Sequence, residues 1–249
     1  MRTFALIILL ALTGCVTTGH TVQKVDKSKM AEGYYMKGLS YLQEKNYEMA
    51  SVEFNRSIQH DSNFKRSYYG LGIISDYQGK LEDAAKYYQT AIDKDPDYSE
   101  AYNALGVVYS KQKKWKEAVN AYNQALANKL YTTPHIPYLN LGDLYMEQKE
   151  YKKAAEAYRE SKRFVNIEWT IIKLGTALFE AEKIKEAIAE FQEGVGLAPQ
   201  NANMRYSLAL AYLKAGNKKS ALMEFRKAAE LAPKSDLAQK ANEYIMTLR

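Results

Sequence analysis

The sequence predicts an all-α protein, an α-solenoid of six helix-turn-helix repeats closed by a C-terminal capping helix. The chain of 249 residues is rich in Ala, Lys, Glu and Tyr and has only five prolines, which favours helix. Written in rows of about 34, residues 31–233 show small and aromatic residues recurring at fixed positions. A single helical hairpin cannot bury its apolar face alone, so the six copies are expected to stack.

The first segment, residues 1–14, has the pattern of an export signal. Arg2 gives a positive start, and residues 4–12 form an apolar run of nine residues. That run is too short to cross a hydrocarbon core of about 30 Å, which needs roughly 20 residues, but it has the length of a signal-peptide core. Residues 12–15, Leu-Thr-Gly-Cys, resemble a bacterial lipobox, which implies lipidation (palmitate) of Cys15. An ordinary signal peptide with a chance cysteine, or a buried apolar helix, is the alternative.

The second segment, residues 15–30, is predicted to be the acylated cysteine and a flexible tether. Residues 16–30 are polar, lack apolar periodicity and have a reach of roughly 20 Å. Cys15 is the only cysteine, so no disulfide framework is expected. Val16 stands where inner-membrane lipoproteins of the resembled class usually carry Asp, so we expect lipid anchoring in the outer membrane, facing the periplasm.

The third segment, residues 31–233, holds the repeats, whose small and aromatic residues explain how two helices pack. The eighth position of the rows is Gly38, Gly72, Gly106, Gly142, Gly175 and Ala209. The twentieth is Ala50, Ala84, Ala118, Ala154, Ala187 and Ala221. The twenty-fourth is Phe54, Tyr88, Tyr122, Tyr158, Phe191 and Phe225. This pattern resembles the tetratricopeptide repeat (TPR), in six copies, and the resemblance implies close helix pairs with an aromatic beside them.

The last segment, residues 234–249, is predicted to be the capping helix. Ser235 is a plausible N-cap, and apolar residues then recur at helical spacing at Leu237, Ala241, Ile245 and Leu248. A helix with a single apolar stripe is what the end of a solenoid requires.

The predicted binding site lies on the concave face. In the TPR family, positions 2, 5, 9 and 12 of each repeat point into a groove that binds protein partners. From these positions, the candidate binding residues are Tyr35, Leu39, Tyr69, Ile73, Asn103, Val107, Leu139, Asp143, Ile172, Tyr206 and Leu210. An open groove dominated by apolar residues normally marks a binding site; the alternative is that some of them pack within the solenoid. Tyr35 and Leu39 replace the first two residues of the family's carboxylate clamp, so an acidic C-terminal tail is not expected as ligand.

No pattern of an enzyme is found in the sequence. His20, His60 and His135 stand alone, without a second histidine at metal-ligand spacing, and there is no phosphate-binding loop or nucleophile motif. We therefore expect no enzymatic activity, metal, cofactor or small-molecule substrate. The formal net charge is +6, with a +4 excess in residues 214–249, and no continuous basic stripe that would favour nucleic acid is evident.

The order of signal peptide, lipobox, tether and six TPRs resembles the type IV pilus pilotin family (the PilW/PilF/Tgl lipoproteins). Residues 131–145, YTTPHIPYLNLGDLY, are similar to a stretch of that family. The extra length between the third and fourth repeats falls in residues 130–142. The alternative interpretation of this segment is a loop that adjusts the curve of the solenoid. The resemblance implies a secretin subunit as protein partner, localised and assembled in the outer membrane. The alternative is a periplasm-facing adaptor that scaffolds cell-wall hydrolases or synthases.

Overall fold

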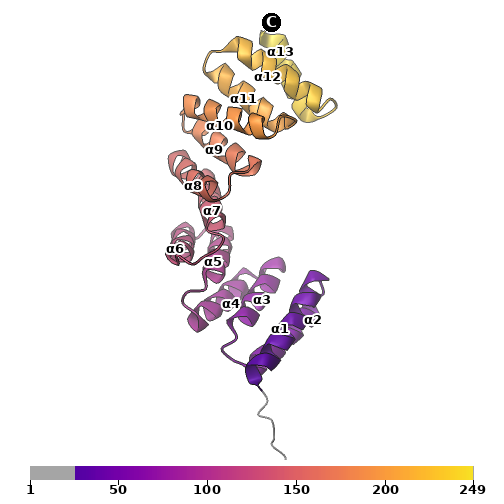
Figure 1. Cartoon of the computed structure of the whole chain (residues 1–249), viewed down its shortest axis with the longest axis vertical. Coiled ribbons are helices and arrows are strands. Elements are labelled where there is room, and N and C mark those ends of the chain that lie inside the picture. Colours follow the sequence, from indigo (N-terminus) through magenta and orange to yellow (C-terminus); the bar gives the residue numbers. More distant parts are fainter. Residues whose placement is uncertain (1–25, 249) are drawn as a thin grey trace, which may run out of the picture.

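The computed structural model describes residues 26–248, which form thirteen helices and no strand. In chain order the helices are α1 Lys27–Gln43, α2 Tyr47–His60, α3 Lys65–Tyr77, α4 Leu81–Lys94, α5 Ser99–Lys111, α6 Trp115–Ala127, α7 His135–Glu147, α8 Tyr151–Phe164, α9 Glu168–Glu180, α10 Ile184–Leu197, α11 Ala202–Lys214, α12 Lys218–Leu231 and α13 Asp236–Leu248. Consecutive helices pair into six hairpins that stack into an elongated solenoid, with α1 and α2 at one end and α13 at the other (Figure 1). The predicted fold class is confirmed. The predicted signal peptide and Cys15 lie outside the described residues.

The two ends of the solenoid are defined by capping side chains. Ser235 accepts a hydrogen bond from the Ala238 backbone N–H through its Oγ at 3.1 Å, so α13 begins where the sequence predicts. At the other end, α1 begins at Lys27, which lies inside the segment that the sequence assigns to the tether. The Asp26 carboxylate accepts from the backbone N–H of Ser28 at 3.1 Å, and this cap accounts for the earlier start.

Each hairpin closes around an aromatic ring that faces a residue without a bulky side chain. In the third hairpin, Tyr122 is 2% exposed, and a Cβ built on Gly106 would lie 2.6 Å from its Cε1. The glycines at the equivalent position of the first, second, fourth and fifth hairpins meet their own aromatic rings in the same way, whereas the sixth hairpin has the fully buried Ala209 there. Ala118, opposite on α6, is fully buried. In the five hairpins with glycine at position 8, the ring therefore occupies the space that a larger residue would need.

Gly106→Ala is expected to lower the free energy of unfolding by about 1–3 kcal/mol, because the new methyl group overlaps the Tyr122 ring. A loss of stability is unusual for this change, since alanine inside a helix is normally more stabilising than glycine by roughly 0.5–1 kcal/mol. Gly33→Ala in α1 is the matched control: no atom lies within 4 Å of its Cβ, so it should stabilise. Chemical denaturation followed by circular dichroism compares them, and a gain in midpoint for both variants would contradict the packing described.

The connections between helices form two separate edges of the solenoid. The turns inside hairpins, residues 44–46, 78–80, 112–114, 148–150, 181–183 and 215–217, make the turn edge. In all six, the central residue has positive φ; these are Lys45, Gly79, Lys113, Lys149, Glu182 and Gly216. The connections between hairpins, residues 61–64, 95–98, 128–134, 165–167, 198–201 and 232–235, make the loop edge. Ion pairs join neighbours along each edge, with Lys214 and Glu182 at 2.7 Å on the turn edge and Lys65 bound to Asp95 near the loop edge.

The extra length that the sequence shows between the third and fourth repeats lies in residues 128–134 of the loop edge. The Asn128 side-chain amide donates to the Asp97 carbonyl at 3.0 Å, which ties this loop to the preceding one. Tyr131 turns inward and is 9% exposed, whereas Leu130 is 87% exposed. The α6–α7 junction packs less closely than the other junctions between hairpins. The insertion therefore coincides with the loosest step of the stack.

Candidate functional site

The concave face is built by the first helices of the hairpins. Besides their own hairpin partners, these helices contact one another across successive repeats, as α1 with α3, α5 with α7, and α9 with α11. Side chains on their inner side therefore come from residues about 34 apart in sequence and lie next to each other in space. Two pockets open on this face.

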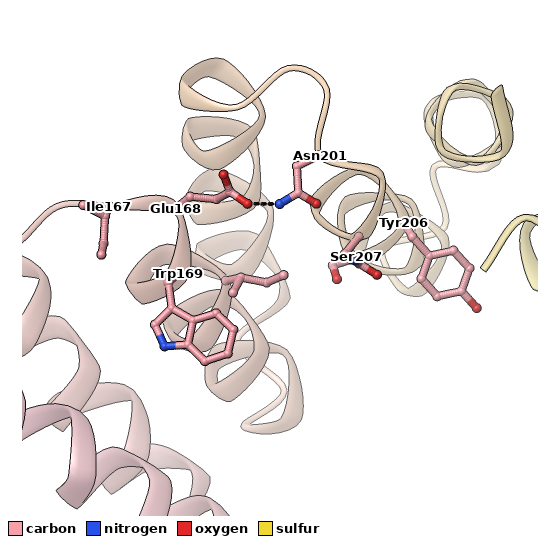
Figure 2. Close-up of a pocket in the computed structure, with 8 residues that line it drawn as sticks. Ile167, Glu168, Trp169, Asn201, Tyr206 and Ser207 are labelled. Carbon is pink, nitrogen blue, oxygen red and sulfur yellow. Dashed lines mark hydrogen bonds between the residues drawn. The ribbon is translucent and has the colours of Figure 1, made fainter. Parts of the chain in front are cut away.

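The larger pocket, of about 700 Å³, lies between the first turns of α9 and α11 (Figure 2). Its lining residues are Ile167, Glu168, Trp169, Ile172, Asn201, Asn203, Tyr206 and Ser207. Trp169 and Ile167 are 58% and 51% exposed, although both side chains are large and apolar. Glu168 and Asn201 are hydrogen-bonded to each other across the pocket (Figure 2). The pocket thus offers apolar area beside amide and hydroxyl groups, which suits a peptide segment.

Trp169 is held from one side by a chain of polar contacts that reaches α7. The Lys173 ammonium lies 4.9 Å from the centre of the Trp169 ring and 2.5 Å from Asp143 Oδ1. Asp143 also accepts a hydrogen bond from the Tyr158 hydroxyl at 2.5 Å. Burial, together with this contact, raises the pKa of Tyr158, so its hydroxyl keeps the donor proton. These contacts fix Lys173 over the indole and leave the exposed part of the ring to the pocket.

The smaller pocket, of about 280 Å³, lies between α5 and α7. Its lining residues are Val107, Ser110, Lys111, Lys113, Tyr122, Asn140, Asp143, Leu144 and Glu147. Asn140 donates a hydrogen bond to the Asn103 side chain at 2.9 Å beside it. Of the predicted groove residues, Val107 and Asp143 therefore line this pocket, while Ile172 and Tyr206 line the larger one.

Asn103 lies beside the smaller pocket through its contact with Asn140. The six other predicted residues are half-buried and pack against the cores of their hairpins; these are Tyr35, Leu39, Tyr69, Ile73, Leu139 and Leu210. Tyr69 shows why a residue at position 5 is not free in the groove. Its ring lies 5.5 Å from that of Tyr88 and 5.4 Å from that of Tyr98, and burial raises the pKa of Tyr69 to about 12. Position 5 of the repeat thus serves the core as much as the groove. Truncating Tyr69 would disturb packing and would be a poor probe of binding.

The sequence reasoning missed Trp169, Ile167 and Asn203 as pocket residues. Trp169 and Asn203 occupy position 2 of the fifth and sixth repeats, a position that the family places in the groove. A tryptophan at that position was the available signal. Ile167 lies in the loop before α9, outside the repeated positions, so the repeat pattern gave no indication of it.

The stack of helical hairpins with an open concave face defines this protein as a helical-repeat scaffold. The chain belongs to the tetratricopeptide repeat family. One family model matches residues 69–133 and 172–236, and a second matches residues 31–64 and 137–163. This repeat fold typically binds proteins or peptides. No curated protein matches the sequence.

Solved structures of similar fold include two pilus proteins. The chain resembles PilF of Pseudomonas aeruginosa with a TM-score of 0.71 and 20% identity, covering 87% of this chain and 98% of that one. It resembles PilW, a widely conserved type IV pilus biogenesis factor, with a TM-score of 0.69 and 18% identity, covering 85% and 98%. It also resembles YrrB, a TPR protein with an unusual peptide-binding site, with a TM-score of 0.65 and 22% identity, covering 76% and 97%. At these identities the likeness shows the fold.

The described helices of residues 26–248 were compared with what a membrane span and a metal site require. None of the helices in this range has the length and apolar character needed to cross a bilayer. Within the same range, His, Cys, Asp and Glu side chains do not gather in any group of three or more that could hold a metal ion.

Proposed function

We propose that this protein is a non-catalytic, lipid-anchored TPR lipoprotein of the outer membrane that assists the localisation and assembly of secretin subunits for type IV pili. The observation that carries the binding part is the pocket between α9 and α11, where Trp169 is 58% exposed on a concave face. A large aromatic side chain with few rotamers is a favourable anchor for a partner segment. The lipobox at Cys15 supports the anchor. The similarity in fold to PilF and PilW supports the pilus assignment.

The mechanism is capture rather than chemistry. An apolar secretin segment that has not yet assembled would aggregate, and burial of its side chains against Trp169, Ile172 and Tyr206 removes that apolar surface from water. Asn203 and Ser207 supply donors and acceptors for the backbone of the captured segment. Release into the multimer then requires only that contacts between secretin subunits be stronger than those in the pocket.

Trp169→Ala is expected to abolish crosslinking of the protein to its partner in envelopes while the helix content is unchanged. The matched control is Tyr77→Ala, which removes an aromatic ring that is 71% exposed but lies in the second hairpin, away from the pocket. Circular dichroism checks the fold of both variants. Partner recovery with Trp169→Ala at the level of the Tyr77→Ala control would refute the pocket as the binding site.

Deletion of the gene tests the proposed role in pilus assembly independently of whether the pocket binds a partner. If the partner is a secretin, heat-resistant secretin multimers should disappear from unheated envelopes on immunoblots while secretin monomer persists. Normal multimers after deletion would exclude the pilotin role and leave the second candidate, an adaptor that scaffolds cell-wall hydrolases or synthases. That candidate is favoured by the peptide-binding character of the pocket alone, and it predicts cell-wall enzymes among the crosslinked partners.

A further inference from the structure

The positive charge of this protein is concentrated at one part of the turn edge. The turns of the third to sixth hairpins, with their flanking residues, are residues 111–117, 147–153, 180–186 and 214–220. We call these four segments the lysine edge. They hold twelve lysines and six glutamates, so their net charge is +6, the same as the formal net charge of the whole chain. The rest of the chain therefore has equal numbers of basic and acidic residues.

The four segments lie next to one another in space. Lys113 of the third turn and Glu147 of the fourth line the same pocket. Lys153 of the fourth and Glu182 of the fifth line another, of about 380 Å³. Glu182 is paired with Lys214 of the sixth turn at 2.7 Å. The lysine edge is thus one continuous row along the solenoid, although its parts are far apart in the sequence.

Most of the lysines in this row have no partner of opposite charge. Among the ion pairs of residues 26–248, none involves Lys113, Lys114, Lys116, Lys149, Lys152, Lys185, Lys218 or Lys219. All eight are exposed. Three of the six glutamates, by contrast, are paired with lysines of the same row: Glu150, Glu182 and Glu186. The unneutralised charge of the row is therefore strongly positive.

Apolar and aromatic side chains lie between these lysines. Trp115, Tyr151 and Ile184 are the first residues of α6, α8 and α10, and each is half-buried. Lysine beside tryptophan and tyrosine is the composition of protein surfaces at the level of lipid headgroups, where the rings lie at the interface and the ammonium groups reach phosphates. An electrostatic contact with a dissolved acidic partner would not need these rings.

We propose that the lysine edge binds the anionic phospholipid headgroups of a bilayer and lays the solenoid along the membrane. The contact is independent of the proposed anchor at Cys15, and it adds an orientation that attachment at a single point does not supply. The opposite, loop edge would then face away from the bilayer. Leu130 and Ile167 lie on that edge, and Phe164 and Leu197 directly precede it at the ends of α8 and α10. These apolar residues are 87%, 51%, 55% and 57% exposed, so they remain open to a partner.

Sedimentation with vesicles tests this proposal without the lipid anchor. The chain from residue 16 onward, which contains every helix described, is mixed with phosphatidylcholine vesicles that contain or lack phosphatidylglycerol. We expect it to sediment only with the anionic vesicles and to be released by added salt. Lys116→Glu with Lys152→Glu should weaken this binding by at least about tenfold, since each lysine near an anionic surface contributes substantially to attraction. Both changes fall in the first turn of a helix, where a carboxylate is favourable for folding.

The matched control is Lys94→Glu with Lys129→Glu, which makes the same change in net charge next to the loop edge. It should retain most of the binding. Equal loss in both double variants would show that only net charge matters and would overturn the proposal. So would equal binding to neutral vesicles. Binding to poly-glutamate without binding to anionic vesicles would assign the edge to an acidic protein instead. None of these outcomes depends on the partner of the pocket.

Discussion

Cys15→Ala is expected to abolish incorporation of a palmitate analogue and to release the protein from the outer membrane. The apolar run of residues 4–12, with Leu-Thr-Gly-Cys at residues 12–15, leaves one sulfur to carry the lipid, because the chain has a single cysteine. The effect should be all or none, unlike the graded losses expected for packing variants. Metabolic labelling measures the lipid, and fractionation of envelopes measures the location.

The fold should not depend on this residue, because the thirteen helices lie within residues 26–248. Circular dichroism of Cys15→Ala is expected to match the unchanged protein. Cys15→Ser is a useful second variant, since it keeps the size and polarity of the side chain but offers no thiol. Label on either variant would refute the lipobox interpretation and, with it, the proposed location.

Arg205→Met is expected to lower the free energy of unfolding by about 3–5 kcal/mol, because it leaves a buried charge without its partner. Arg205 of α11 and Glu224 of α12 form an ion pair at 2.7 Å, and their side chains are only 12% and 6% exposed. The Arg205 Nε also donates to the Pro199 carbonyl at 2.8 Å, which holds the loop before α11. Removing the guanidinium leaves the Glu224 carboxylate buried near only Lys227, at 3.6 Å.

Two controls separate this effect from a general loss of charge. Lys214→Ala breaks the pair with Glu182, whose side chains are 44% and 67% exposed, and should change stability by less than about 1 kcal/mol. Arg205→Met combined with Glu224→Met should recover most of the loss, because no buried charge then remains. Urea denaturation of the three variants gives the comparison. A double variant as unstable as Arg205→Met would show that the contacts of Arg205 other than the ion pair dominate.

The fold could be predicted from the sequence because its determinants recur. Gly106 must be small where Tyr122 is large. A small residue recurs beside an aromatic one at the same spacing in all six hairpins, glycine in five and alanine in the sixth, so six weak signals combine into one strong one. The start of α1 could not be placed as well. The Asp26 cap lies five residues before the first repeat, whereas Asn201, which caps α11, lies directly before the sixth, so the repeat spacing does not locate the start of α1.

The binding site was less predictable for a physical reason. A side chain at position 5 lies at the boundary between groove and core, and the repeat pattern does not say which side it joins. Tyr69 packs between two tyrosines. Tyr206 packs beside Phe225 and Tyr244 and also lines the larger pocket. The arrangement of charge in space could not be predicted from the sequence either. Counting along the chain places the excess in residues 214–249, while stacking brings lysines of four turns into one row.

The positions of Trp169 and Trp115 have a practical consequence. They are the two tryptophans of the chain, one in the larger pocket and one in the lysine edge. The intrinsic fluorescence of the unlabelled protein therefore has one emitter at each proposed surface. Filling the pocket should shift the Trp169 emission to shorter wavelength, and contact with lipid should do the same for Trp115. The variants Trp115→Phe and Trp169→Phe isolate the two spectra, so occupancy of each surface is readable in solution without a dye.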